Sequence, residues 1–546
     1  MLKKREDIFN ILIAGIFSIF QMICFFGSAD ILCGKEEKNS FERGDRPAPK
    51  NEIDIRIAKN LEKKGLTPAP ICSDAVFLRR IHIDLLGRLP LAKEVMEFLN
   101  DQDPEKRSKM IDRLLDSDRF VDYQTMRWAD LLRVKSEFPI NLWPNGAAVY
   151  HRWIQAAVRE NLPYDQFVYT LLTSSGSNFR CGPANFYRAI QMRDANTIAE
   201  AAGSVFLGIQ VDDLPEKEQA QFSKFFSRVA YKGSAQWKEE IVYWDSTPLE
   251  SPDLVYPDGS KGKIDGYQDP RVLFADWLVR PENELFRKNI VNRVWAWLFG
   301  KGLVHPEDDF RKENPSVCPG LLEYLAQELL TAKFDLRHIY RIILNSNTYQ
   351  RSFLMKKYDP DAEKYFAVYP VRRINAEVLQ DIFIQLFKLQ ITYMSEVPEP
   401  YSFLPSQLQT IEIADSGITN SFLEMFGRAT RDTGTDVDRN NDITGAQELF
   451  FLNSNEVNKW VRRFAENLTG WKRQNQGKRP YSDGRNENRG NGIHPSVLWL
   501  SILSRFPTKE EKELFDEDFK KTGSKMPMLE DYIWTLINSK EFLCQH

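Results

Sequence analysis

The sequence lacks the short motifs that mark the common enzyme classes. It contains no GxSxG, HExxH, GxGxxG or phosphate-binding P-loop sequence. Its six histidines show no spacing typical of metal ligands. These absences argue against the hydrolases, metallopeptidases and nucleotide-binding enzymes that such motifs define. They leave open whether the protein is an enzyme at all.

Paired cysteines and excess positive charge are also missing. None of the six cysteines forms a CxxC pair, and we expect most of them to be buried free thiols. The net charge is -4, with 73 basic and 77 acidic residues. Without a basic excess the chain has little charge with which to release counterions from phosphates. We therefore predict no nucleic-acid partner.

A long apolar run occurs only near the N-terminus. Lys3, Lys4 and Arg5 precede an apolar run over residues 9–26, and small residues follow. This order is typical of a secretory signal, so we predict a signal peptide over residues 1–29 and a periplasmic or cell-surface location. The alternative is an uncleaved membrane anchor, because the run is nearly long enough to span a bilayer. Membrane contact is expected only through this segment.

The rest of the chain has the composition of a globular protein, with 42% hydrophobic and 27% charged residues. Apolar residues recur at helical spacing along most of it, and Gly300 is expected to end a helix that begins near Glu284. Two short strands are expected, at residues 241–244 and 410–413. The sequence therefore predicts a mainly α fold with long irregular loops and a few short strands.

The expected organisation is two helical domains. We predict a linker at residues 30–52, a first domain at 53–245, a connecting loop at 246–267, and a second domain at 268–546. Residues 468–494 contain few apolar side chains and many Asn, Gly and Arg residues, which indicates a flexible insertion in the second domain.

Several sequence stretches resemble a known pair of domains. The first half is similar to the planctomycete cytochrome-C-associated domain (domain of unknown function 1549), and the second half to planctomycete-specific domain one (domain of unknown function 1553). The matching stretches are RRIHIDLLGRLP at 79–90, RWADLLR at 127–133, NLPYDQF at 161–167, NIVNRVW at 289–295, GKGLV at 300–304, SNTYQRS at 346–352 and INSKEFL at 537–543. The resemblance implies other exported proteins and a polysaccharide as partners.

The chain departs from this family where many members bind haem. Those members carry a CxxCH motif near the end of the first domain, because covalent haem needs two thiols and a histidine ligand. Here the corresponding stretch, residues 206–213, reads FLGIQVDD and contains neither residue type. We therefore predict no c-type haem and disfavour a role as a redox partner.

One acidic segment is a candidate calcium site. Oxygen-bearing side chains alternate at Asp436, Asp438, Asn440 and Asp442, as in the first half of a calcium-binding loop. The glycine and the final glutamate of such a loop are missing, since Asn441 and Gln447 occupy those positions. A solvated acidic loop is the alternative interpretation.

Several charged residues lie within apolar stretches and need partners if they are buried. Asp84 and Asp130 are candidates for structural ion pairs with arginines. The other interpretation is a pair of carboxylates for hydrolysis. Further candidate ligand-binding residues are Arg293, Arg372, Arg373 and Glu377. Two residues of the segment before Tyr150 are candidates as well, because Trp143 beside Asn145 would suit stacking on a sugar ring.

These observations favour an exported binding protein or complex component that takes part in the use of an extracytoplasmic polysaccharide. The alternative is a hydrolase that acts on a carbohydrate or a sulfated polymer. Calcium is the only cofactor for which the sequence offers a candidate site.

Overall fold

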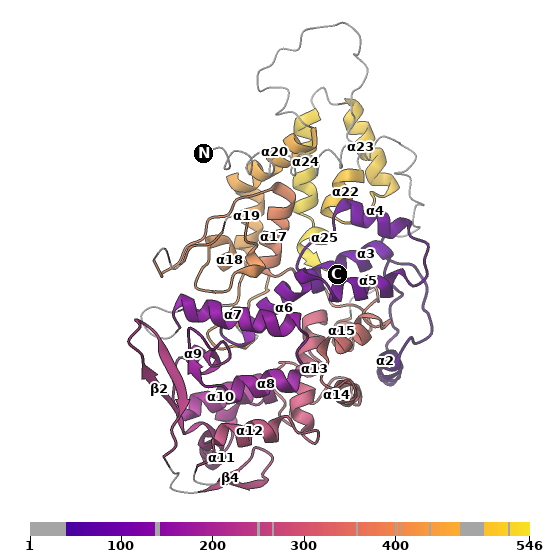
Figure 1. Cartoon of the computed structure of the whole chain (residues 1–546). Helices are drawn as coiled ribbons and strands as arrows, with labels where there is room; N and C mark the ends of the chain where they lie inside the picture. The colour runs from indigo at the N-terminus through magenta and orange to yellow at the C-terminus, as the bar shows by residue number, and fades with distance from the viewer. Residues whose placement is uncertain are drawn as a thin grey trace.

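The computed structural model describes residues 40–136, 142–247, 252–264, 267–355, 359–398, 400, 402–405, 407–435, 438–469, 496–521 and 525–546. The predicted signal peptide and nearly all of the predicted insertion at 468–494 lie outside these residues. The described chain is mainly α with a few short strands, as predicted (Figure 1). Within those ranges, no helix combines the length and the apolar character that a membrane span requires.

The first part of the chain forms short helices with well-defined ends. They are α2 (Glu52–Lys64), α3 (Asp74–Leu86), α4 (Ala92–Asn100), α5 (Lys106–Leu115), α6 (Asp118–Leu131), α7 (Pro144–Arg159), α8 (Tyr164–Thr173), α9 (Asn185–Ala189), α10 (Ala195–Leu207), the 3-10 helices η2 (Val211–Asp213) and η3 (Lys224–Phe226), and α11 (Glu216–Ser223). The Asn51 and Ser73 side chains cap α2 and α3 by accepting backbone N–H groups. Gly65 ends α2 with a φ of 68°, a left-handed conformation that glycine adopts without strain.

The second part of the chain adds a further set of helices. They are α12 (Pro270–Leu278), α13 (Glu284–Phe299), α14 (Leu321–Thr331), α15 (Leu336–Leu344), α16 (Pro360–Lys364), α17 (Ala376–Phe387), α18 (Ser421–Met425), α19 (Gly445–Asn453), α20 (Asn455–Thr469), α22 (Ser496–Ile502), α23 (Lys509–Lys521), α24 (Lys525–Ile537) and α25 (Lys540–Leu543). The helix predicted from Glu284 is α13, and Gly300 ends it as expected, with a φ of 78°.

In the described residues the strands form three small antiparallel sheets. They are β1 (Gly176–Ser177), β3 (Glu240–Trp244) and β2 (Val229–Gly233) in that spatial order, the pair β4 (Asp253–Val255) and β5 (Lys261–Lys263), and the pair β6 (Arg372–Arg373) and β7 (Cys544–Gln545). The strand predicted at 241–244 is β3. The β4–β5 pair lies within the stretch predicted as a connecting loop.

The second predicted strand, at residues 410–413, is wrong. These residues form the 3-10 helix η4 (Thr410–Glu412). The carboxylate of Asp381 on α17 accepts the backbone N–H groups of Thr410 and Ile411, at 2.6 and 3.3 Å. A tertiary contact therefore takes the N–H groups that a β-ladder would have used.

Two hydrophobic clusters form the interior. The first core draws on residues 53–369 together with Leu500, and the second on residues 374–542 together with Ile83, Leu89, Tyr123 and Met126. Buried side chains from before and after residues 246–267 thus share the first core. The predicted division of the chain at that loop remains a prediction.

Helix α3 connects the first part of the chain to its C-terminal end. Arg79 donates to the carbonyls of Ile502 and Phe542, at 3.0 and 2.8 Å, and Arg80 donates to the carbonyl of His546, at 2.9 Å. Both arginines are almost completely buried. Figure 1 shows α3 beside the yellow C-terminal segment that contains α25.

Candidate functional site

Asp84 lies in a buried cluster that supplies partners for both of its carboxylate oxygens. Its side chain is 1% exposed, and Arg372 approaches Oδ1 to 2.6 Å. The hydroxyls of Tyr349 and Tyr369 donate to Oδ2, at 2.7 and 3.1 Å. Both carboxylate oxygens are therefore used within the protein, and the cluster fixes β6 against α3. Arg372, a predicted ligand-binding residue, is likewise part of this ion pair.

Asp130 and Glu377 belong to one buried ion network. Arg439 lies between them, with Nη2 at 2.7 Å from Asp130 and Nη1 at 2.7 Å from Glu377. Arg431 also contacts Asp130, at 2.8 Å. Burial raises the pKa of Glu377, but attraction to Arg439 and Arg428 outweighs it and lowers this pKa to about 2. The network joins α6 to α17 and holds the Glu377 carboxylate ionised.

The two other predicted arginines bind backbone carbonyls. Arg373 donates to the carbonyls of Phe426 and Asn440, at 2.7 and 2.8 Å. Arg293 is 2% exposed on α13 and donates to the carbonyl of Ser204 on α10, at 2.9 Å. These contacts position neighbouring segments and place neither guanidinium on a ligand-accessible surface.

The predicted calcium segment is only partly described, since Asp436 lies outside the described residues. The Asp438 carboxylate accepts the backbone N–H groups of Thr433 and Gly434, at 2.9 and 3.0 Å. The Asn440 side-chain oxygen accepts the N–H of Asp442, at 2.8 Å. Among the described residues, no group of three or more His, Cys, Asp or Glu side chains could hold a metal ion. The calcium site stays a prediction.

A carboxyl pair joins α10 to the 3-10 helix that follows it. Glu200 on α10 shares a hydrogen bond with Asp212 of η2. Burial, this hydrogen bond and the charge of Asp212 raise the pKa of Glu200 to about 7. Sequence inspection did not identify this pair, because its members are twelve positions apart and lie on different elements.

The predicted sugar-stacking residue Trp143 is not on the surface. It is 4% exposed at the N-cap of α7, whereas Asn145, two residues further on, is exposed. The exposed tryptophan here is Trp237, at 61%, whose ring lies edge-on against Trp143 with the ring centres 4.8 Å apart. A buried ring cannot stack on a sugar, so the candidate at this surface moves from Trp143 to Trp237.

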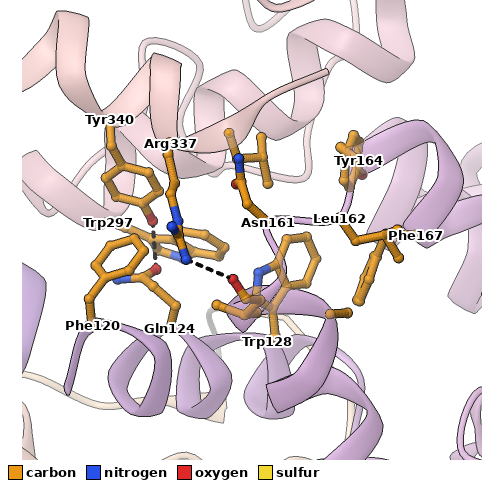
Figure 2. A pocket seen from close by; sticks show the side chains of 13 residues that line it. Phe120, Gln124, Trp128, Asn161, Leu162, Tyr164, Phe167, Trp297, Arg337 and Tyr340 are labelled. Atoms are coloured by element: carbon orange, nitrogen blue, oxygen red, sulfur yellow. Dashed lines mark hydrogen bonds between the residues drawn. The ribbon is translucent and has the colours of Figure 1, made fainter. Parts of the chain in front are cut away.

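An aromatic pocket lies between α6, the α7–α8 connection, α13 and α15 (Figure 2). Its volume is about 40 Å³, and Trp128, Trp297 and Tyr340 are among its lining residues. Arg337 crosses it and donates to the carbonyl of Val158, at 3.2 Å, while the Tyr340 hydroxyl donates to Gln124, at 2.6 Å. Such a space holds on the order of one or two water molecules. The pocket is therefore too small for a sugar ring, and its lining side chains hold the surrounding helices together.

A much larger groove, of about 1090 Å³, lies on the outer side of α2. Ile53, Ile57 and Leu61 are four residues apart and face the first core, so the opposite side of α2 faces solvent. The buried Asp54 carboxylate fixes the helix by accepting the N–H groups of Asn347 and Thr348, at 2.9 and 2.8 Å.

The opposite wall of the groove is the loop that follows α13. The buried Asn292 side chain donates to the carbonyl of Val304, at 2.8 Å, and accepts its N–H, at 3.0 Å. A Cβ on Gly302 would lie 2.2 Å from that carbonyl oxygen, so only glycine permits this close approach. Asn60 on α2 donates to the carbonyl of Val317, at 3.0 Å, which fixes the two walls to one another.

The groove is strongly cationic although the whole chain is acidic. Among the described residues that line it, six are lysines or arginines and one is a glutamate: Arg56, Lys59, Lys63, Lys64, Lys301 and Lys364 against Glu52. Arg56 already pairs with Glu52, at 2.8 Å. Lys64 and Lys364 place their ammonium groups 4.8 and 5.5 Å from the ring centre of Tyr365. The arrangement can bind an anion that carries several charges.

Sequence inspection missed this groove. Lys59 and Lys63 are four positions apart, which places them on one helical face, and this spacing was a usable signal. Lys301 and Lys364 lie far along the chain, and only the fold brings them to α2.

Comparison with known proteins identifies the two halves of the chain. The family described as "Protein of unknown function (DUF1549)", or PSCyt2, matches residues 52–227, and "Protein of unknown function (DUF1553)", or PSD1, matches residues 270–518. No curated protein and no solved structure matches the chain. The groove combines α2 from the first matched region with the loop and α16 from the second. The chain belongs to the proteins in which a DUF1549 region precedes a DUF1553 region.

Proposed function

We propose that the protein binds an anionic polysaccharide in the groove between α2 and the loop after α13, as a non-catalytic component of an exported assembly. The observation that carries this proposal is the excess of six cationic side chains over one carboxylate along the groove. Cationic side chains that lie close together repel one another unless an anion neutralises them. Such a cluster is therefore expected where a ligand supplies the missing negative charge.

The dimensions of the groove favour a polymer over a small anion. The cations come from three separate segments of the chain and line an open space of about 1090 Å³. A single sulfate or phosphate would contact only a few of them. A chain of sulfated or carboxylated sugars carries an anion on successive units and could meet all three segments at once.

The predicted secretory signal supports a polysaccharide over a nucleic acid as the polymer. An exported protein in the periplasm or at the cell surface meets acidic polysaccharides far more often than nucleic acids.

The lining of the groove favours binding over hydrolysis. Glycoside hydrolysis uses two carboxyl groups on either side of the scissile bond. Of the described residues along the groove, only Glu52 is a carboxylate, and it pairs with Arg56. The Glu200–Asp212 pair is not among the lining residues. The predicted hydrolase and redox alternatives gain no support from this site.

Affinity electrophoresis in gels that contain dextran sulfate tests the proposal. The variant Lys59→Gln/Lys63→Gln/Lys301→Gln removes three groove charges and keeps side chains of similar length. We expect it to bind the polymer roughly 10- to 100-fold more weakly than the wild type, at about 0.5–1 kcal/mol for each lost charge contact.

The matched control removes three exposed lysines outside the groove, as Lys459→Gln/Lys512→Gln/Lys520→Gln. It has the same net charge as the groove variant, so any general electrostatic attraction falls equally in both. Retardation of the control should match the wild type in dextran sulfate, and neutral dextran should retard none of the three proteins. Equal loss of retardation in both variants would refute a specific site.

A further inference from the structure

A second surface of the molecule presents a fixed aromatic ring. Trp237 lies in the turn between β2 and β3, and its side chain is 61% exposed. Trp143 is 4% exposed and supports the Trp237 ring from behind, in an edge-on contact with an interplanar angle of 73°. An exposed tryptophan that a buried tryptophan holds in place loses little further freedom when a ligand binds.

The backbone of this turn is also fixed. The fully buried Asn178 donates to the carbonyl of Lys238, at 3.3 Å, and accepts the N–H of Glu240, at 3.0 Å. Glu239, whose side chain is 6% exposed, accepts hydrogen bonds from Ser177 and Ser234. The turn thus holds Trp237 in one orientation, as a preformed binding surface would.

Positive charge accompanies the ring. Lys238 places Nζ 5.7 Å from the ring centres of both Trp143 and Trp237. Arg180, 75% exposed, lies 3.4 Å from Glu239 in the same turn. The surface therefore combines one aromatic face with cations, and Gln236 adds an exposed amide.

We propose that Trp237 stacks on the face of a pyranose ring whose carboxylate or sulfate group is bound by Lys238. One aromatic face among polar neighbours matches a sugar, which has one apolar face and a polar rim. A protein partner would instead favour a broader apolar patch around the tryptophan. The neighbours of Trp237 in the turn, Ser234, Ala235, Gln236 and Lys238, include only the small Ala235 as an apolar residue and supply no such patch.

This contact is separate from the groove. Figure 1 shows β2 and α2 at opposite edges of the molecule, and neither Trp237 nor Lys238 lines the groove. The inference shares with the proposed function only the class of ligand. Either site can therefore fail without the other.

Fluorine NMR of the protein labelled with 5-fluorotryptophan tests this proposal. The Trp237 signal is assigned from the spectrum of Trp237→Phe, which keeps an aromatic ring and should fold normally. The acidic probes are an oligogalacturonate and a sulfated galacto-oligosaccharide, and the methyl-esterified oligogalacturonide is the neutral probe. We expect at least one acidic probe to shift the Trp237 signal, and the neutral probe to shift it only at concentrations about tenfold higher.

The probe that shifts the signal identifies carboxylate or sulfate as the recognised group. The same shift should persist in Lys59→Gln/Lys63→Gln/Lys301→Gln, which separates this site from the groove, and it should weaken in Lys238→Gln. If the Trp237 signal does not move with either acidic probe, or moves equally with the neutral one, the proposal is overturned. Loss of the shift in the groove variant would also overturn it, because the ring would then not form an independent contact.

Discussion

At the scale of single residues, replacement of Glu377 should have the strongest electrostatic effect on the stability of the fold. Its carboxylate is 1% exposed and depends on Arg439 and Arg428 for its charge. Replacement by leucine should lower the free energy of unfolding by about 3–5 kcal/mol, because Arg439 loses one of its two buried partners. The double variant Glu377→Leu/Arg439→Met should be more stable than the single variant. Urea denaturation measures both, with Glu424→Leu on the exposed side of α18 as control.

The pH dependence of this effect has a definite sign. The folded pKa of Glu377 is about 2, below the ordinary value of 4.5. The carboxylate therefore stabilises the fold fully above pH 4.5, and this contribution is lost as the pH falls toward 2. The stability difference between the wild type and Glu377→Gln should shrink across this window. A difference that stays constant from pH 7 to pH 3 would contradict the ionised network.

Glu200 should behave in the opposite way. Its folded pKa of about 7 lies above the ordinary value of 4.5. Ionisation then costs more in the folded than in the unfolded protein, so stability falls as the pH rises from 4.5 to 7. Glu200→Gln should raise the melting temperature at pH 8 and leave it nearly unchanged at pH 4. Melting curves at the two pH values decide this, with Glu216→Gln on α11 as an exposed control.

At the scale of elements, α2 depends on one buried carboxylate. Asp54 accepts the backbone N–H groups of Lys50, Asn347 and Thr348 as well as the Thr348 hydroxyl. Asp54→Ala would leave buried donors without acceptors, at a cost of about 2–4 kcal/mol. Urea denaturation should show this loss, whereas Asp361→Ala on the exposed side of α16 should change stability little. Equal stability of the two variants would show that α2 is held mainly by its apolar face.

The sequence predicted those elements whose determinants are local. Gly300 ends α13 because glycine adopts the left-handed conformation there, and the apolar residues at 241–244 form β3 as expected. The strand expected at 410–413 was wrong, because a carboxylate from α17 binds the N–H groups of that segment. The residues within and next to such a segment do not indicate that a distant side chain will bind its backbone.

The candidate site was predicted less well than the fold, for the same reason. Asp84, a candidate for a structural ion pair, pairs with Arg372, whereas Glu377, a candidate ligand-binding residue, also lies in an ion network. Trp143 was chosen for its neighbours in sequence, whereas Trp237, almost a hundred positions later, takes the exposed place in the same cluster. The groove lysines required the tertiary structure to bring residues 59, 301 and 364 together.

At the scale of the whole molecule, the two family regions share their interior. Gln124 on α6 binds Tyr340 on α15, and Asp84 on α3 binds Arg372 on β6. A fragment of residues 40–247 would lack both partners and part of the first core. We expect this fragment to show no cooperative melting by circular dichroism, in contrast to the chain of residues 40–546. Cooperative melting of the fragment would show that the first region folds alone.

The groove is likewise a property of the whole molecule, because both family regions supply its walls. Hydrogen exchange of the protein with and without dextran sulfate tests the binding of an anionic polysaccharide there most directly. We expect slower exchange of backbone amides in residues 52–64 and 300–319 with dextran sulfate, and no change with neutral dextran. Unchanged exchange in both segments at a polymer concentration that saturates binding would contradict the proposed site.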